Sequence, residues 1–303
     1  MHATGPTLAR ARADLLLALT AVQASRGHLQ VASTGLRDAE RLYQDVGARG
    51  LRAAALANLA EVELGQGESS AAWQHGSAAL EEARASGRGP GEVAALRILG
   101  AAALQLGDLE EASRHLELAR ERAKELEIGT ELVAIHYLVA RVRLAAGEAR
   151  AALRALDLAQ LDAKDGDPEH YLPAIAAARA CSLALVGEPE AARAAIAMAE
   201  AALVGLPALW RAQATLEVAQ AHVYLGDAER GLALALSAGQ AATVRGFRML
   251  ALESLVLAAA ACPDPAERAR LLAEARRMQT AMAAALPARW APAFRSRPGF
   301  EAS

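Results

Sequence analysis

The chain is poor in aromatic residues, in cysteine and in net charge, and each shortage excludes a class of protein. Aromatic residues make up 3% of the 303 residues although hydrophobic residues make up 54%, so alanine supplies much of the apolar content. The two cysteines, Cys181 and Cys262, stand far apart, which supports neither a disulfide framework nor a zinc site. The formal charge of −3 gives no reason to expect nucleic acid or an acidic substrate.

Long apolar runs are missing as well. No uninterrupted apolar stretch reaches the roughly 18–20 residues that a membrane-spanning helix needs, so we expect a soluble protein without membrane contact. The two separate cysteines make the reducing cytoplasm the expected compartment. Arg10 and Arg12 precede the apolar stretch LLLALTAVQA, which loosely resembles a signal peptide. Asp14 borders that stretch, and the segment falls in register with the repeat described next. A helix of the fold is therefore the favoured interpretation.

An internal repeat of forty residues runs along most of the chain. It is marked by a glycine at each interval, the last interval being thirty-nine: Gly27, Gly67, Gly107, Gly147, Gly187 and Gly226. Five residues later stand Ala32, Ala72, Ala112, Ala152, Ala192 and Gly231, and twelve residues later Ala39, Ala79, Ala119, Ala159, Ala199 and Ala238. Glycine or alanine thus recurs at the same three positions of six successive units, which indicates a repeat architecture.

Each unit is predicted to be a helical hairpin. Apolar residues recur at helical spacing on both sides of the glycine, which is suited to end the first helix. Asp108 in the third unit can cap the second helix, and Glu68, Glu148, Glu188 and Asp227 hold the equivalent place. The recurring alanines permit close helix crossing, and stacking of units supplies the missing core.

The predicted fold is thus an all-α solenoid of about seven hairpins over residues 1–287, followed by a capping tail over 288–303. The units lie near 8–48, 49–88, 89–128, 129–168, 169–207, 208–247 and 248–287.

The third unit resembles the tetratricopeptide repeat (TPR) family in a lengthened bacterial form. The residues that carry the resemblance match the family's L-x-x-L-G…G-D-hydrophobic-x-x-A…A spacing: Leu96, Leu99, Gly100, Gly107, Asp108, Leu109, Ala112, Leu116 and Ala119. The resemblance implies a right-handed superhelix whose first helices line a concave groove. The period of forty departs from the usual 34 residues, and most of the family's aromatics are replaced by leucine or alanine.

The tail adds a narrower resemblance. Its L-P…F-x-x-R-P ending, carried by Leu286, Pro287, Phe294, Arg297 and Pro298, is similar to repeat modules of large bacterial regulators. Seven arginines against four acids from Pro263 onward, with Trp290 and Phe300 among them, could also stack on single-stranded nucleic acid. Aromatic capping of the last hairpin is the favoured interpretation.

No catalytic or metal motif is evident. The glycine-rich segment at 87–91 lacks a preceding strand and a Gly-Lys-Ser/Thr sequence, and the acidic loop at 162–170 lacks the ligand order of an EF-hand. The seven histidines form no H-E-x-x-H motif. We therefore predict a non-enzyme that needs no cofactor and no metal.

The family resemblance places candidate partner-binding residues on the first helices of units two, three, four and six. The candidates are Asn58, Glu61, Arg97, Gln105, Tyr137, Arg141, Gln213, Glu217, Gln220 and Tyr224. A cluster of Arg97, Tyr137 and Arg141 is the expected hot spot, because arginine and tyrosine are enriched where binding energy concentrates.

Two functions remain open. The first is a scaffold or adaptor that binds a protein or peptide segment in the groove, in bacterial signalling or complex assembly. The second is a small-effector sensor module of a transcriptional or kinase/ATPase regulator, which would need a closed apolar pocket. Membership of a larger regulatory or enzymatic complex, and self-association through the solenoid ends, are further expectations.

Overall fold

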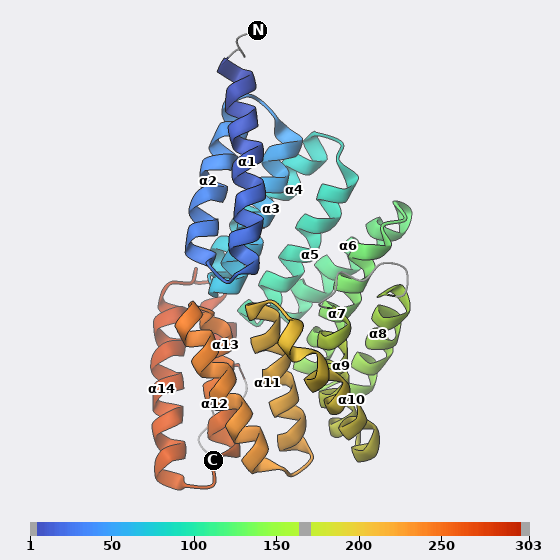
Figure 1. Ribbon diagram of the computed structural model, residues 1–303, viewed down its shortest axis with the longest axis vertical. Coiled ribbons are helices and arrows are strands. Elements are labelled where there is room, and N and C mark those ends of the chain that lie inside the picture. Colours follow the sequence, from blue (N-terminus) through green and yellow to red (C-terminus); the bar gives the residue numbers. More distant parts are fainter. Residues whose placement is uncertain (1–4, 164–170, 298–303) are drawn as a thin grey trace.

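The computed structural model describes residues 5–163 and 171–297 of the chain. Fifteen α-helices account for most of these residues, and the described ranges contain no strand. The predicted all-α solenoid is confirmed (Figure 1). No helix of the described ranges is long and apolar enough to cross a membrane.

The helices form consecutive antiparallel pairs, each packed mainly on its immediate neighbours. The first pairs are α1 (Gly5–Ser25) with α2 (Leu29–Asp45), α3 (Arg49–Gln66) with α4 (Ser69–Ala85), and α5 (Gly89–Leu106) with α6 (Leu109–Glu125). The middle pairs are α7 (Gly129–Ala145) with α8 (Ala149–Asp162), and α9 (Tyr171–Val186) with α10 (Pro189–Ala202). After the short 3-10 turn η2 (Leu203–Gly205) come α11 (Ala208–Tyr224), α12 (Ala228–Arg245), α13 (Arg248–Ala261), α14 (Pro265–Ala284) and α15 (Ala291–Arg295).

The six marker glycines end the first helix of their hairpins in the left-handed conformation, with φ between 75° and 84°. A second series of left-handed residues, not recognised in the sequence, lies between hairpins at Gly47, Gly87, Glu127 and Gly246. Glu127 holds a position where its predecessors at the same forty-residue interval are glycine. The inter-hairpin turn therefore recurs at four positions, one of which is not a glycine, whereas the turn before α11 is formed by η2 and the extended Leu206 instead.

The predicted helix caps are correct for the aspartates and wrong for the glutamates. Asp108 accepts the backbone N–H of Glu111 at 3.1 Å, and Asp227 accepts that of Arg230 at 3.2 Å. Glu68, Glu148 and Glu188 make no such bond. The aspartate carboxylate is one methylene closer to the backbone, whereas Glu148 extends to Arg143 at 2.8 Å instead.

The recurring small residues form the helix crossings, as predicted. All five alanines at the first marker position and five at the second are completely buried. Gly231 replaces alanine in the sixth unit, where the helix crossing leaves no space for a methyl side chain. A Cβ added there would lie 2.5 Å from a methyl group of Val223 and 3.0 Å from the carbonyl oxygen of Ala219.

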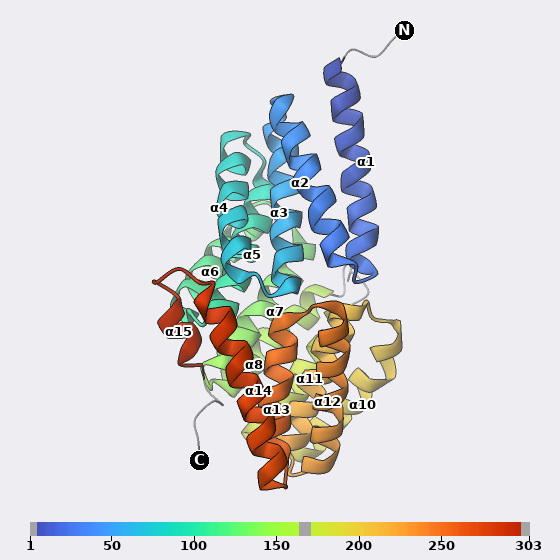
Figure 2. The same ribbon diagram turned by 90° about the vertical axis from the view of Figure 1, so that its left-hand side faces the viewer.

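The solenoid returns on itself, so that its C-terminal hairpins contact its first hairpins. Helices α2, α3, α11, α12 and α13 contribute to one apolar cluster that includes Leu36, Leu59, Leu216 and Phe247. Figures 1 and 2 show α12 and α13 lying directly below the ends of α2 and α3. The curvature is therefore held by side chains that are more than 150 residues apart in sequence.

The tail segment 289–297 spans this junction. Trp290 packs edge-on against Trp73 of α4 with ring centroids 5.2 Å apart, and the Arg289 guanidinium lies 4.3 Å from the Trp290 ring. Arg297 donates to the carbonyl oxygen of Gln105 at 2.9 Å and forms an ion pair with Glu253 at 3.0 Å. The tail thus joins the last hairpin to the second and third units. Residues 298–303 and the acidic loop residues 164–170 lie outside the described ranges.

We expect Gly100→Ala to destabilise the protein, although alanine ordinarily stabilises a helix interior by about 1 kcal/mol relative to glycine. The new Cβ would lie 2.6 Å from Cγ of the buried Leu116, and overpacking of this kind costs about 1–3 kcal/mol. Chemical denaturation should show a lower free energy of unfolding. Gly129→Ala is the control, because its Cβ meets nothing within 4 Å. Equal stability of the two variants would contradict the proposed crossing geometry.

Candidate functional site

We call the surface formed by the first helices of the hairpins the inner face. The strongest candidate site is a polar cluster on this face, between α7 and α11, which lie on either side of α9. We call Tyr137 and Arg141 of α7 with Gln213 and Glu217 of α11 the Glu217 cluster. Tyr137 OH donates to Glu217 Oε1 at 3.0 Å, although the two residues are 80 positions apart. Four predicted groove residues are thus brought together from two hairpins.

Glu217 is the centre of this cluster. Gln213 Nε2 also donates to Oε1 at 2.8 Å, and Arg141 Nε lies 3.6 Å from the same oxygen. The other oxygen, Oε2, is buried and has no hydrogen-bond partner in the described part of the chain. A buried carboxylate oxygen without a donor is energetically unfavourable, so Glu217 belongs to an incomplete polar network.

The electrostatics of the cluster follow from its burial. Glu217 is 6% exposed, and burial raises the pKa of its carboxyl group although Arg141, Gln213 and Tyr137 act in the opposite direction. Burial also raises the pKa of Tyr137 well above its ordinary value, and the charge of Glu217 raises it further. Tyr137 therefore acts as a hydrogen-bond donor at any ordinary pH.

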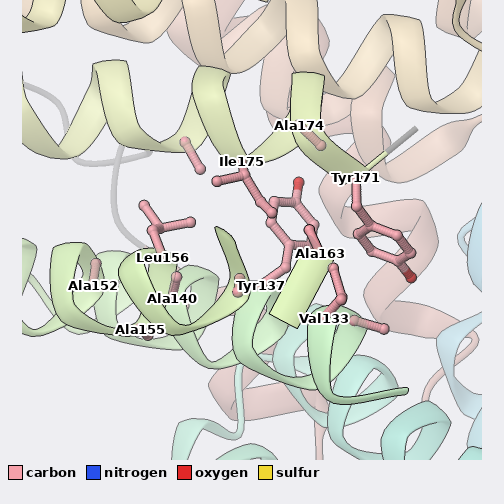
Figure 3. Close-up of a cluster of buried hydrophobic side chains, with 13 residues drawn as sticks. Val133, Tyr137, Ala140, Ala152, Ala155, Leu156, Ala163, Tyr171, Ala174 and Ile175 are labelled. Atoms are coloured by element: carbon pink, nitrogen blue, oxygen red, sulfur yellow. The ribbon is translucent and has the colours of Figure 1, made fainter. Parts of the chain in front are cut away.

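Three aromatic rings pack beside the cluster, in a chain that has few of them. Tyr137, Tyr171 and Trp210 lie on α7, α9 and α11 with ring centroids 4.8–6.0 Å apart. Figure 3 shows Tyr137 and Tyr171 among Val133, Ala163 and Ile175. The rings join three hairpins at the place where the polar cluster is formed, and they hold α7 and α11 in a defined relation.

Arg97, the third expected hot-spot residue, belongs to a separate set of contacts. Its guanidinium lies 3.0 Å from Glu61 of α3 and 2.8 Å from Glu131 of α7. Burial by itself would lower the pKa of Arg97, but the two carboxylates raise it. With its side chain 13% exposed and paired on both sides, Arg97 links three consecutive first helices.

Gln105, Gln220 and Tyr224 have partners outside the Glu217 cluster. Gln105 donates to the carbonyl oxygen of Leu64 at 3.1 Å and accepts from Ser69 at 2.7 Å. Gln220 donates to the hydroxyl of the exposed Tyr224 at 2.9 Å, while Asn58 is half-buried on α3. These side chains extend the polar inner face beyond the Glu217 cluster without joining it.

The sequence reasoning missed Glu131, Glu253, Trp210 and Arg297 as members of the inner face. Glu131 lies sixteen residues before its marker glycine, whereas the predicted groove residues lie 2 to 13 residues before theirs. Arg297 belongs to the predicted capping tail, and its contact with Gln105 joins residues 192 positions apart. No local pattern could have indicated that contact. In the described ranges no group of three or more His, Cys, Asp and Glu side chains could hold a metal ion.

Comparison with solved structures identifies chains of similar architecture, among them a Rap protein. The Rap protein, solved complexed with competence and sporulation factor, superposes with a TM-score of 0.75 at 15% sequence identity. The match covers 93% of this chain and 78% of the Rap chain. This chain has a TPR-like helical-repeat fold. No protein-family model matches the sequence, and no curated protein is significantly similar to it.

We expect the raised pKa of Glu217 to appear as a pH dependence of stability. The native state holds the carboxyl proton of Glu217 more tightly than the unfolded chain does. The free energy of unfolding therefore falls as the pH rises from 4.5 through the raised pKa. Glu217→Gln removes this contribution. The stability of the variant relative to wild type should therefore increase over that interval, as measured by urea denaturation at several pH values.

The matched control for this measurement is Glu229→Gln, which changes an exposed carboxylate on α12. It controls for the replacement of a carboxylate by an amide at a solvent-exposed position. A pH-independent stability difference between Glu217→Gln and wild type would show that Glu217 is not held in the buried environment described.

Proposed function

We propose that this chain is a non-catalytic scaffold that binds an extended segment of another protein or a peptide on its inner face, centred on the Glu217 cluster. The supporting observation is a pair of unmet hydrogen-bonding requirements in adjacent side chains. Glu217 Oε2 lacks a donor, and the η nitrogens of Arg141 make no hydrogen bond to a described residue. Arg141 keeps 27% of its side chain exposed.

A peptide group matches these two requirements. Its N–H can donate to a carboxylate and its C=O can accept from a guanidinium, and hydrogen bonds to charged groups contribute about 1.5–3 kcal/mol each. Because the carboxylate oxygen is buried, the ligand's N–H reaches it only when neighbouring side chains move aside. The neighbouring Gln220 and Tyr224 offer further polar contacts for a longer segment.

The inner face favours a chain-like ligand over a small effector. The polar side chains extend from Glu61 on α3 to Tyr224 on α11 rather than converging on one enclosed apolar space. Two open hollows, of about 580 and 430 Å3, lie at the turns of Gly147 and Gly27, away from the Glu217 cluster. A similar fold occurs in a Rap protein solved with a bound factor, which supports a regulatory role in bacterial signalling or complex assembly.

We expect peptides selected from a random display library on the wild-type protein to depend on the Glu217 cluster. Arg141→Gln should weaken their affinity by about 10- to 100-fold, because one charge-assisted hydrogen bond is lost. Tyr137→Phe should also weaken binding, since Glu217 then loses the donor that orients it. Isothermal titration calorimetry on the selected peptides gives both values.

Arg154→Gln is the matched control, because Arg154 is exposed on the second helix α8. It should bind the selected peptides as the wild type does, and circular dichroism should show the same helicity for all three variants. Equal affinity of the wild type and Arg141→Gln would overturn the assignment of the inner face.

A further inference from the structure

The C-terminal tail places an arginine on the inner face. Arg297 Nη2 forms an ion pair with Glu253 of α13 at 3.0 Å, and Nη1 donates to the carbonyl oxygen of Gln105 at 2.9 Å. Gln105 lies near the end of α5, so the guanidinium joins the third unit to the seventh where the solenoid closes. In this position Arg297 acts on the charges of the inner face as well as on the curvature.

Anchoring of the tail does not depend on Arg297 alone. Phe294 is buried between α13 and α14, and Trp290 packs against α4. Gln279 of α14 donates to the carbonyl oxygens of Phe294 and Arg295 at 3.0 and 3.2 Å, and α15 lies beside α14 (Figure 2). Removal of the charge at position 297 therefore leaves these other anchors in place.

Glu253, the partner of Arg297, borders the Glu217 cluster. Helix α13 packs beside α11 through an apolar cluster that contains Leu216 and Leu250. Glu217 follows Leu216 directly, and Glu253 lies about one helical turn beyond Leu250. Burial is the main cause of the raised pKa of Glu217, and the charge of Glu253 raises that pKa further. Burial by itself would lower the pKa of Arg141, whereas the charge of Glu253 is among those that raise it.

Two carboxylates thus act on Arg141. Its Nε lies 3.6 Å from Glu217, and it forms no ion pair with Glu253, although the structure describes both residues. The side chains of Arg141 and Glu253 are 27% and 29% exposed, so both have room to change rotamer. Without Arg297, Glu253 would be a partly buried carboxylate with no cation of its own, and such a charge is costly to leave uncompensated. It would attract the η nitrogens of Arg141.

We propose that Arg297 is the counter-ion that keeps Glu253 from capturing Arg141, so that the docked tail holds Arg141 ready for a ligand of the inner face. The inference rests on the proposed function as far as the ligand is concerned, whereas the ordering of the charges can be tested without a ligand. Arg297 is a positioning residue, because it acts on Arg141 through Glu253. Binding at the inner face is then coupled to docking of the tail.

The first test uses the full chain and the peptides selected on the wild-type protein. Arg297→Gln should weaken their affinity by about 10-fold, which lies within the range for directly coupled neighbours. Arg297→Gln combined with Glu253→Gln should regain most of that affinity, because no uncompensated carboxylate is left to attract Arg141. Arg297→Lys keeps the positive charge and should bind more tightly than Arg297→Gln. Isothermal titration calorimetry gives the affinities.

The matched control is Arg295→Gln, which changes an exposed arginine of the same short helix and should bind as the wild type does. The double variant distinguishes a counter-ion from a purely structural strap. If Arg297 acted only by holding the curvature, the loss of affinity would remain in the double variant, because both variants lack the bond to Gln105. Tryptophan fluorescence checks that Trp290 stays buried in every variant.

A titration without ligand tests the charge coupling itself. Carboxyl-carbon NMR measures the pKa of Glu217, whose signal is assigned by its loss in Glu217→Gln. This pKa should rise in Arg297→Gln, because the charge of Glu253 is then no longer compensated. It should return towards the wild-type value in the double variant, which lacks both charges.

The other groups that face Glu217 stay the same in these variants. They are Tyr137 and Arg141 of α7, Cys181 of α9 and Gln213 of the same helix. Burial raises the pKa values of Tyr137 and Cys181, so both side chains remain uncharged during the titration. A change in the pKa of Glu217 therefore reports on Glu253 and Arg297.

Three results would overturn the proposal. These are equal peptide affinity of the wild type and Arg297→Gln, a loss of affinity that persists in the double variant, and an unchanged pKa of Glu217 in Arg297→Gln. The second result would assign Arg297 a purely structural role. If the wild type binds no peptide, the proposed function is wrong, and the titration alone decides whether Arg297 controls the charges of the Glu217 cluster.

Discussion

The close approach of helix axes is the constraint on which the whole structure depends. Each hairpin crosses at a fully buried small residue, and the sixth hairpin, where a backbone carbonyl and Val223 come closest, requires glycine at position 231. Small side chains add little apolar surface of their own, so a single hairpin has almost no core. Stability comes from stacking, and a change at one crossing is transmitted to the neighbouring units.

Stacking of the hairpins also closes the solenoid, so that its C-terminal hairpins contact its first hairpins. The hairpins rotate against one another until α13 reaches α3, where Gly67 leaves only 3.0 Å between a hypothetical Cβ and the backbone nitrogen of Met249. The tail then completes the junction through Trp290 and Arg297. A solenoid is ordinarily stabilised by contacts between neighbours alone, whereas this chain adds contacts between its ends. The added contacts limit changes of curvature.

The inner face carries the polar side chains that this curvature brings together. Arg97 is neutralised by carboxylates from both neighbouring first helices, and such a paired arrangement is what makes a largely buried guanidinium tolerable. The Glu217 cluster is less complete, since one carboxylate oxygen and the Arg141 η nitrogens have no partner among the residues that the structure describes. Where a buried polar network is incomplete in a folded protein, the missing partner is a reason to look for a ligand.

The sequence by itself determined the helical hairpins, their period and the residues at which they cross, because these depend on spacing within about forty residues. Gly107, Asp108 and Ala112 lie in one short stretch, and their roles follow from local helix geometry. The failure of the glutamate caps shows that even local rules depend on side-chain reach. The left-handed Glu127 shows that a turn position held by glycine in other units can be taken by another residue. The pairing of Tyr137 with Glu217 and of Arg297 with Gln105 was decided only by the tertiary structure. Those contacts depend on the rotation accumulated over several hairpins, and small differences in each crossing add up to determine which distant side chains meet.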